Sequence, residues 1–246
     1  YNTIFQQIRE TLQFVELSDI LQSSGKNIYI SHESILLDYD NAFINETQNK
    51  QHFCCSGHML WIGDRTRKLE SAHIQFASLI ENPIGIKIGP NFNIDDLNIL
   101  CEKINPKNEV GKLTLIVRLG EKNIESMLPQ LIKKIKHYGH NVTWFCDPMH
   151  GNTIRAKNGY KTREFETIIK EIKLFFAIHK HFNTIPGGIH LELTGDRVTE
   201  CLGGINNIQT KDLDLRYETT CDPRLNNEQS LEVAFLIADL LKREND

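Results

Sequence analysis

The chain lacks most of the features that mark nucleic-acid-binding, membrane or disulfide-stabilised proteins. Its 246 residues carry 28 Lys and Arg against 32 Asp and Glu, so no overall basic field favours nucleic acid. No apolar run approaches the roughly 20 residues that span a bilayer. The six cysteines form no Cys-x-x-Cys pair, which favours reduced, buried thiols over a disulfide framework. We expect a soluble, cytoplasmic protein that binds neither nucleic acid nor a membrane, or a plastid protein in case a transit peptide precedes Tyr1.

Glycine-rich phosphate-binding motifs are also missing. No GxGxxG or GxxxxGK[ST] stretch follows a predicted strand, which counts against dinucleotide and P-loop binding. Low-complexity tracts, long linkers and convincing repeats are absent as well. What recurs instead is a unit made of a short apolar run, a polar break and a stretch with helical spacing of its apolar residues.

This unit predicts alternating strands and helices. The predicted strands are Phe53–Ile62, Ile84–Ile88, Leu113–Leu119, Val142–Cys146, Ile189–Leu193 and Leu215–Thr219. The predicted helices after them are Thr66–Leu79, Ile94–Glu102, Asn123–His137, Arg163–Ala177 and Asn227–Leu241. Two more helices, Ile4–Leu21 and His32–Phe43, are expected before the first strand. We therefore expect a helical segment at 1–50 and a single barrel part at 51–246.

Strand and helix in regular alternation favour a parallel sheet in an α/β protein. Six such units are more than a small open sheet needs and fewer than the eight that close a barrel. We therefore predict a (β/α)₈ TIM barrel whose first two strands lie upstream of Tyr1. An open, doubly wound sheet is the alternative.

Metal-binding side chains follow three of the predicted strands. His150 lies in the segment after Val142–Cys146, and Asp222 follows Leu215–Thr219. His190 and Glu192 are two apart in one strand, so they share a face. Taken singly, each is as well explained by a structural role. Together, His150, Glu192 and Asp222 predict a divalent-metal site, for example for Mn²⁺, Fe²⁺, Co²⁺ or Zn²⁺.

Several cations are predicted at the same end of the sheet. Lys87 and Arg118 each interrupt an apolar strand, and a cation buried there needs a partner. That partner is either a carboxylate of a neighbouring strand or the phosphate or carboxylate of a ligand. Asp64 and Arg65 follow the first predicted strand. The stretch 155–163, which includes Lys161 and Arg163, is either a second phosphate site or a solvated surface loop.

These motifs resemble a known family, the class II (plant-type) 3-deoxy-D-arabino-heptulosonate 7-phosphate (DAHP) synthases. The resemblance runs in order from about Ser31 to the C-terminus. It is carried by SGHMLWIGDRTR at 56–67, NPIGIKIGP at 82–90, CDPMHGNT at 146–153, GGIHLELTGDRVTECLGG at 187–204 and YETTCDPRL at 217–225. Motifs of this length are far more specific than a lone short pattern.

The resemblance implies a (β/α)₈ barrel that uses a divalent metal, with Mn²⁺ the first choice. It implies the condensation of phosphoenolpyruvate with D-erythrose 4-phosphate to DAHP and phosphate, the first step of the shikimate pathway. Three of the family's four metal ligands are then His150, Glu192 and Asp222. The cations that bind phosphoenolpyruvate are Arg65, Lys87 and Arg118. Lys161 and Arg163 contact the sugar phosphate.

Departures from the family qualify these expectations. Asp64 stands where the family usually has Glu, with a shorter reach into the site. The fourth metal ligand is a cysteine on the family's first strand, so we expect it upstream of Tyr1; Cys54 and Cys55 lie on another strand and do not replace it. A catalytic acid and base are not assigned. We expect the piece alone to be inactive and the full-length protein to be a homo-oligomer. Another metal-dependent barrel lyase or aldolase acting on a phosphorylated sugar, or an inactive remnant, remains as an alternative.

Overall fold

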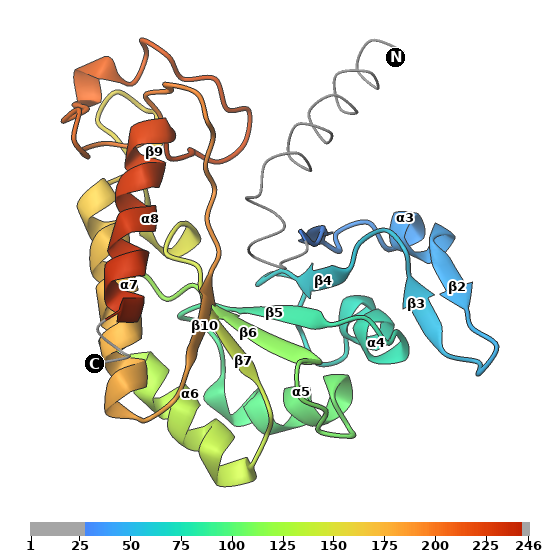
Figure 1. Ribbon diagram of the computed structural model, residues 1–246. Coiled ribbons are helices and arrows are strands. Elements are labelled where there is room, and N and C mark those ends of the chain that lie inside the picture. Colours follow the sequence, from blue (N-terminus) through green and yellow to red (C-terminus); the bar gives the residue numbers. More distant parts are fainter. Residues whose placement is uncertain (1–27, 243–246) are drawn as a thin grey trace, which may run out of the picture. The chain divides into compact units, whose positions relative to one another are not determined.

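The main element of the protein is a six-stranded parallel sheet (Figure 1). A computed structural model describes residues 28–242, and residues from Ser31 onward belong to one compact unit. In spatial order the strands are β1 (Ser31–Glu33), β4 (Met59–Ile62), β5 (Ile84–Ile88), β6 (Leu113–Val117), β7 (Thr143–Cys146) and β10 (Pro186–Ile189). An α/β fold with a parallel sheet is therefore confirmed. The strand order follows the chain without the reversal that characterises doubly wound sheets.

Helices follow the strands and pack against one another in chain order. They are α4 (Ala72–Leu79), α5 (Leu97–Ile104), α6 (Ile124–Tyr138), α7 (Phe165–His181) and α8 (Asn227–Lys242). Each lies where the spacing of apolar residues predicts a helix, with shifted ends. The first begins six residues later than predicted, at a cap where Ser71 Oγ accepts a hydrogen bond from the Ile74 N–H at 3.3 Å.

The core lies between these helices and the central strands. Every residue of β5 and β6 is buried. Such continuous burial is typical of parallel strands, which are covered on both faces and so read as apolar runs. Lys87 departs from this apolar pattern, because it is a cation inside β5 with only 4% of its surface exposed. Its environment therefore has to supply a counter-charge.

The first strand of the sheet lies where the sequence predicts a helix. β1 pairs in parallel with β4, and helix α3 is confined to Leu37–Ala42, so the predicted helix His32–Phe43 is wrong over its first residues. A strand of three residues is too short to show an alternation of apolar and polar side chains. Its conformation is determined by pairing with β4 and not by its local sequence. The other predicted early helix, Ile4–Leu21, lies outside the described residues.

The predicted strand Phe53–Ile62 is two strands in different sheets. β3 (His52–Cys54) pairs antiparallel with β2 (Ile44–Glu46), and β4 joins the main sheet. The break between them is stabilised by the side-chain amide of Asn82. Its Nδ2 donates to the carbonyl oxygens of Cys54 and Gly57 at 2.9 and 3.1 Å, and its Oδ1 accepts from the Cys54 N–H at 2.8 Å. The amide thus satisfies backbone groups that a continuous strand would pair elsewhere.

The last two predicted strands also need correction. β10 ends at Ile189. Beyond it, the His190 N–H donates to the carbonyl oxygen of Cys146 at 2.7 Å, and Leu193 makes an isolated bridge to Leu225. Leu215–Thr219 is not a strand. Its backbone N–H groups at Glu218 and Thr219 donate to the Glu200 carboxylate instead of a neighbouring strand. The main sheet nevertheless has six strands, the number predicted from the sequence, because it includes β1 and lacks this segment.

Between β7 and α7 the predicted loop contains regular structure. A short 3₁₀ turn, η2 (His150–Asn152), leads into a hairpin of β8 (Thr153–Arg155) and β9 (Lys161–Arg163). Two further 3₁₀ turns are η1 (Ile94–Asp96) and η3 (Thr210–Asp212). The hairpin places Lys161 and Arg163 on the same side of β9, because they are two residues apart.

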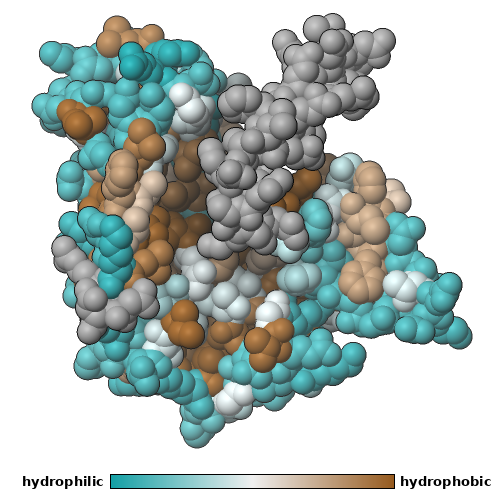
Figure 2. Space-filling model, viewed as in Figure 1, coloured by the Kyte–Doolittle hydropathy of each residue, from teal (hydrophilic) through white to brown (hydrophobic). Residues whose placement is uncertain are grey.

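The final helix leaves part of its apolar surface exposed. Figure 2 shows hydrophobic side chains along α8, to which the exposed Leu231 and Phe235 belong. Among the helices of residues 28–242, none has the length and apolar character needed to cross a bilayer.

Candidate metal and anion site

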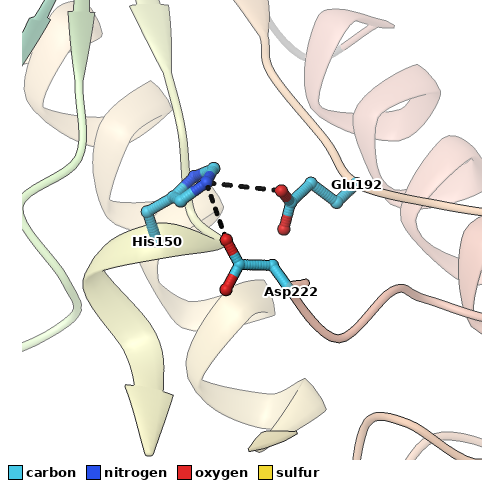
Figure 3. Close-up of side chains that lie close together, drawn as sticks. All are labelled: His150, Glu192 and Asp222. Atoms are coloured by element: carbon cyan, nitrogen blue, oxygen red, sulfur yellow. Dashed lines mark ion pairs between the residues drawn. The ribbon is translucent and has the colours of Figure 1, made fainter. Parts of the chain in front are cut away.

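His150, Glu192 and Asp222 converge at one end of the sheet (Figure 3). His150 Nε2 lies 3.3 Å from Glu192 Oε1 and 3.7 Å from Asp222 Oδ2. One donor atom from each residue lies within 4.8 Å of the other two. The three come from the turn η2, from the chain just after β10 and from the loop before α8. Groups widely separated in the sequence are thus brought to a spacing that a single ion can bridge.

Asp147 orients the imidazole of His150. The Nδ1 atom lies 2.7 Å from Asp147 Oδ2, and Asp147 Oδ1 accepts the backbone N–H groups of Met149 and His150 at 3.0 and 3.1 Å. With Nδ1 engaged, Nε2 points to the two carboxylates. A carboxylate behind the second nitrogen is the usual support of a metal-binding histidine.

The charges of the cluster favour a cation at its centre. Burial lowers the pKa of His150, but hydrogen bonds to Asp147 and Glu192 outweigh it and raise that pKa to about 9. Burial raises the pKa of Glu192, but the neighbouring His150 and Arg163 lower it to a greater extent. The pKa of Asp222 is likewise lowered, against the effect of burial, by Lys161. The two carboxylates therefore stay ionised and stabilise positive charge at the point they share with Nε2, which is the imidazole proton or a metal ion that displaces it.

The two cations predicted to interrupt strands have carboxylate partners, although Arg118 follows the end of β6 and only Lys87 lies inside a strand. Lys87 forms a buried ion pair with Asp147, and Arg118 Nη1 lies 2.8 Å from Asp64 Oδ2. Asp64 Oδ1 in turn accepts hydrogen bonds from Arg67 Nε at 2.9 Å and from the Gly89 N–H at 3.1 Å. Of the two partners predicted for these cations, a protein carboxylate or a ligand anion, the carboxylate is present for both. Both cations also line the cleft described next, so a salt bridge and ligand binding are compatible.

An open cleft of about 460 Å³ contains the cluster. It is lined by Glu33, Ile35, Trp61, Gly63, Asp64, Arg65, Lys87, Arg118, His150, Thr153, Lys161, His190, Glu192, Cys221 and Asp222. Arg65 is exposed there and has no ion pair among the described residues, whereas Lys161 pairs with Asp222. Of the predicted site residues, Arg163 alone does not line the cleft. It is completely buried.

The loop that carries Asp222 is held by a buried carboxylate. Glu200 is inaccessible to solvent and accepts hydrogen bonds from Arg224 Nε and Nη2 at 3.0 and 2.7 Å. It also accepts the backbone N–H groups of Glu218, Thr219 and Arg224 at 3.1, 2.8 and 2.8 Å. Glu200 thereby gives a loop without ladder hydrogen bonds a defined position.

The turn that carries His150 is pressed against the loop after β6. A Cβ atom on Gly151 would lie 2.9 Å from Gly120 Cα and 3.0 Å from the Arg118 carbonyl oxygen. Gly120 itself has φ of +77°, a conformation that other residues rarely adopt. Both positions therefore require glycine.

Some functional contacts escape reasoning from sequence alone. The role of Asp147 was missed, although an Asp three residues before a candidate histidine ligand is a usable signal on a turn. Glu33 was missed because its strand was taken for a helix. Glu200 gives no local signal, because its partners lie 18 to 24 residues away.

Comparison with known proteins gives matches over nearly the whole chain. Residues 1–238 match the class-II DAHP synthetase family. The chain is 46% identical over 245 residues to a phospho-2-dehydro-3-deoxyheptonate aldolase of Streptomyces coelicolor, and 44% identical over 250 residues to the phospho-2-dehydro-3-deoxyheptonate aldolase AroG of Mycolicibacterium smegmatis. Each alignment covers 98% of this chain and 54% of the relative, so the chain spans about half the length of these proteins. The chain belongs to the class-II DAHP synthetase family.

Proposed function

We propose that the protein containing this chain is a DAHP synthase that condenses phosphoenolpyruvate with D-erythrose 4-phosphate. The observation that carries the proposal is the convergence of His150, Glu192 and Asp222 in a cleft also lined by Arg65, Lys87, Arg118 and Lys161. Metal ligands beside four cations suit a reaction between two phosphorylated substrates, and family membership supports the same activity.

The donor set fits a divalent metal. One imidazole nitrogen and two carboxylate oxygens suit Mn²⁺, Fe²⁺, Co²⁺ or Zn²⁺, and we propose Mn²⁺. The Asp147 carboxylate behind His150 supports this assignment, because it fixes the nitrogen that faces the ion. When bound, such an ion supplies Lewis-acid polarisation of the aldehyde oxygen of erythrose 4-phosphate. We assign the fourth ligand to a cysteine of the longer protein.

The cations of the cleft bind and orient the substrates. Arg65, Lys87 and Arg118 neutralise the phosphate and carboxylate of phosphoenolpyruvate and hold its C3 atom against the aldehyde. Lys161 lies on the opposite side of Asp222 from His150 and is assigned to the sugar phosphate. C3 bonds to the aldehyde carbon, water adds at C2, and inorganic phosphate leaves.

The six strands are proposed to form part of a (β/α)₈ barrel. Their order follows the chain from β1 to β10, and these two strands are the edges of the sheet. Unpaired edges and the exposed apolar side of α8 are features that closure by further βα units would remove. The division at residue 50 and assembly into a homo-oligomer remain predictions for the longer protein.

The experiment is a product assay with the full-length protein and Mn²⁺. Stoichiometric formation of DAHP and inorganic phosphate from the two substrates is expected, with Glu192→Gln inactive. Another product, or turnover only with a different phosphorylated sugar, would favour the alternative barrel lyase or aldolase. The isolated 246 residues are expected to release no phosphate.

A further inference from the structure

Arg163 contacts all three chain segments that carry the candidate metal ligands. Its Nη1 atom lies 2.7 Å from Glu192 Oε2 and also donates to the carbonyl oxygen of Pro223, the neighbour of Asp222. Its Nε donates to Thr153 Oγ1 at 3.1 Å, three residues beyond His150. A single guanidinium therefore connects the first residue of β8, which directly follows η2, with the chain after β10 and the loop before α8.

The two oxygens of Glu192 have different partners. Oε1 faces His150 Nε2, and Oε2 faces Arg163. Arg163 therefore fixes the rotation of this carboxylate and leaves the other oxygen directed at the shared point of the cluster. A planar guanidinium suits this task because its donors have a fixed geometry, which a lysine lacks.

Solvent access separates Arg163 from the other cations. Its side chain is completely buried, whereas Lys161, two residues earlier in β9, is 45% exposed and lines the cleft. A substrate phosphate in the cleft meets Lys161 first. It could reach Arg163, whose Nη2 atom has no hydrogen-bond partner among the described residues, only if the packing that encloses the guanidinium opened.

We propose that Arg163 is a positioning residue for the metal site and does not contact the sugar phosphate. It holds Glu192 directly and the segments of Asp222 and His150 through Pro223 and Thr153. The inference rests on the proposed function only for the identity of the substrates. The positioning role itself is tested by measuring metal binding.

The test compares Arg163→Met and Arg163→Lys with the wild type in the full-length protein. Mn²⁺ affinity is measured by titration of the metal-free protein, followed by calorimetry or by the electron paramagnetic resonance signal of free Mn²⁺. We expect the Kd of Arg163→Met to rise by about 10- to 100-fold, as for loss of other outer-shell partners. Arg163→Lys retains the charge beside Glu192 but not all three contacts, so its Kd should lie in between. Arg155→Met, which removes an exposed cation from the same hairpin, should bind Mn²⁺ as the wild type does.

Kinetics at saturating Mn²⁺ separate positioning from substrate contact. We expect the KM for erythrose 4-phosphate to stay within about twofold of wild type in Arg163→Lys. An unchanged Kd for Mn²⁺ together with a large rise in this KM would overturn the inference. If circular dichroism shows that Arg163→Met does not fold, the Kd of Arg163→Lys for Mn²⁺ decides: a higher Kd than that of the wild type supports the inference, and an equal Kd overturns it.

The outcomes also distinguish this inference from the proposed function. A wild type that binds Mn²⁺ but forms no DAHP would refute the function, while weaker binding by the Arg163 variants would still support the positioning role. A wild type without specific Mn²⁺ binding would overturn both.

Discussion

Lys87 and His150 share one oxygen of a buried carboxylate, Oδ2 of Asp147. The ammonium comes from the middle of the sheet, in β5, and the imidazole from the turn after β7. Asp147 is inaccessible to solvent, and both neighbours help to keep its pKa well below the usual range despite burial. One carboxylate thus positions a candidate metal ligand and a candidate substrate-binding cation.

Replacing Asp147 by Asn should damage metal binding and stability together. The amide leaves Lys87 as a buried cation without a counter-charge, a defect that costs about 3–5 kcal/mol in the free energy of unfolding. The Kd for Mn²⁺ should rise about 10- to 100-fold because His150 loses its support. Urea unfolding and Mn²⁺ titration measure the two effects. Asp95→Asn, which removes an exposed partner of Lys134, serves as the control, and equal behaviour of the two variants would contradict the assignment.

Removing a ligand should abolish stabilisation by the metal. An ion that binds only the folded protein raises Tm in proportion to the logarithm of its concentration. We expect Mn²⁺ to raise the Tm of the metal-free full-length protein and EDTA to reverse the rise. Glu192→Gln should lose this response, while Glu166→Gln, on the exposed surface of α7, should keep it. A full Mn²⁺ response in Glu192→Gln would remove Glu192 from the ligand set.

Glu200→Gln should weaken the metal site without touching it. The neutral amide loses the ion pair with Arg224 and cannot accept all of the backbone N–H groups of the Asp222 loop. We expect a loss of about 1–3 kcal/mol in unfolding free energy and a several-fold higher Kd for Mn²⁺. Glu218→Gln, an exposed carboxylate of the same loop, is the matched control. Wild-type Mn²⁺ affinity in Glu200→Gln would show that the loop holds its shape by other means.

His179 should make the protein less stable in acid. Its ring is buried against Phe175, and burial lowers its pKa from 6.5 to about 4. Between these two pH values the unfolded chain binds a proton that the folded chain does not, so stability falls as the pH drops through this window. The full effect is about 3 kcal/mol and should be present at pH 4 and absent above pH 7.

Urea unfolding of His179→Gln at several pH values between 4 and 7 tests this prediction. The variant should lose less stability on acidification than the wild type does. His181→Gln, at the exposed end of the same helix, should follow the wild-type curve. Parallel curves for wild type and His179→Gln would rule out a contribution from this residue.

Amphipathic spacing predicted the long elements of the fold well. Helices α6 and α7 each bury a periodic apolar face, and β5 and β6 are largely apolar runs that are buried throughout, so their local patterns agree with their final environment. Segments whose conformation depends on distant partners were not predictable in the same way. Ser31–Glu33 becomes a strand by pairing with β4, and Leu215–Thr219 is kept out of the sheet by Glu200.

Parallel topology explains why the metal cluster could be anticipated. His150 and Glu192 follow the neighbouring parallel strands β7 and β10 and so meet at one edge, whereas Asp222 reaches this edge from a loop that the sequence predicted to be a strand. The environment of each cation was not predictable, because burial depends on the packing of side chains from several segments. Lys161 and Arg163 look equivalent in the sequence, yet one is in the cleft and the other is enclosed.

The contact between Gly151 and Gly120 restricts how this site can diversify. A methyl group at either position would push the η2 turn away from the β6 loop and carry the His150 ring with it. Random mutagenesis should therefore recover almost no substitutions at these two glycines, while the neighbouring β8–β9 hairpin tip tolerates many. Directed evolution toward longer or shorter sugar phosphates would have to recruit that hairpin and leave the turn as it is.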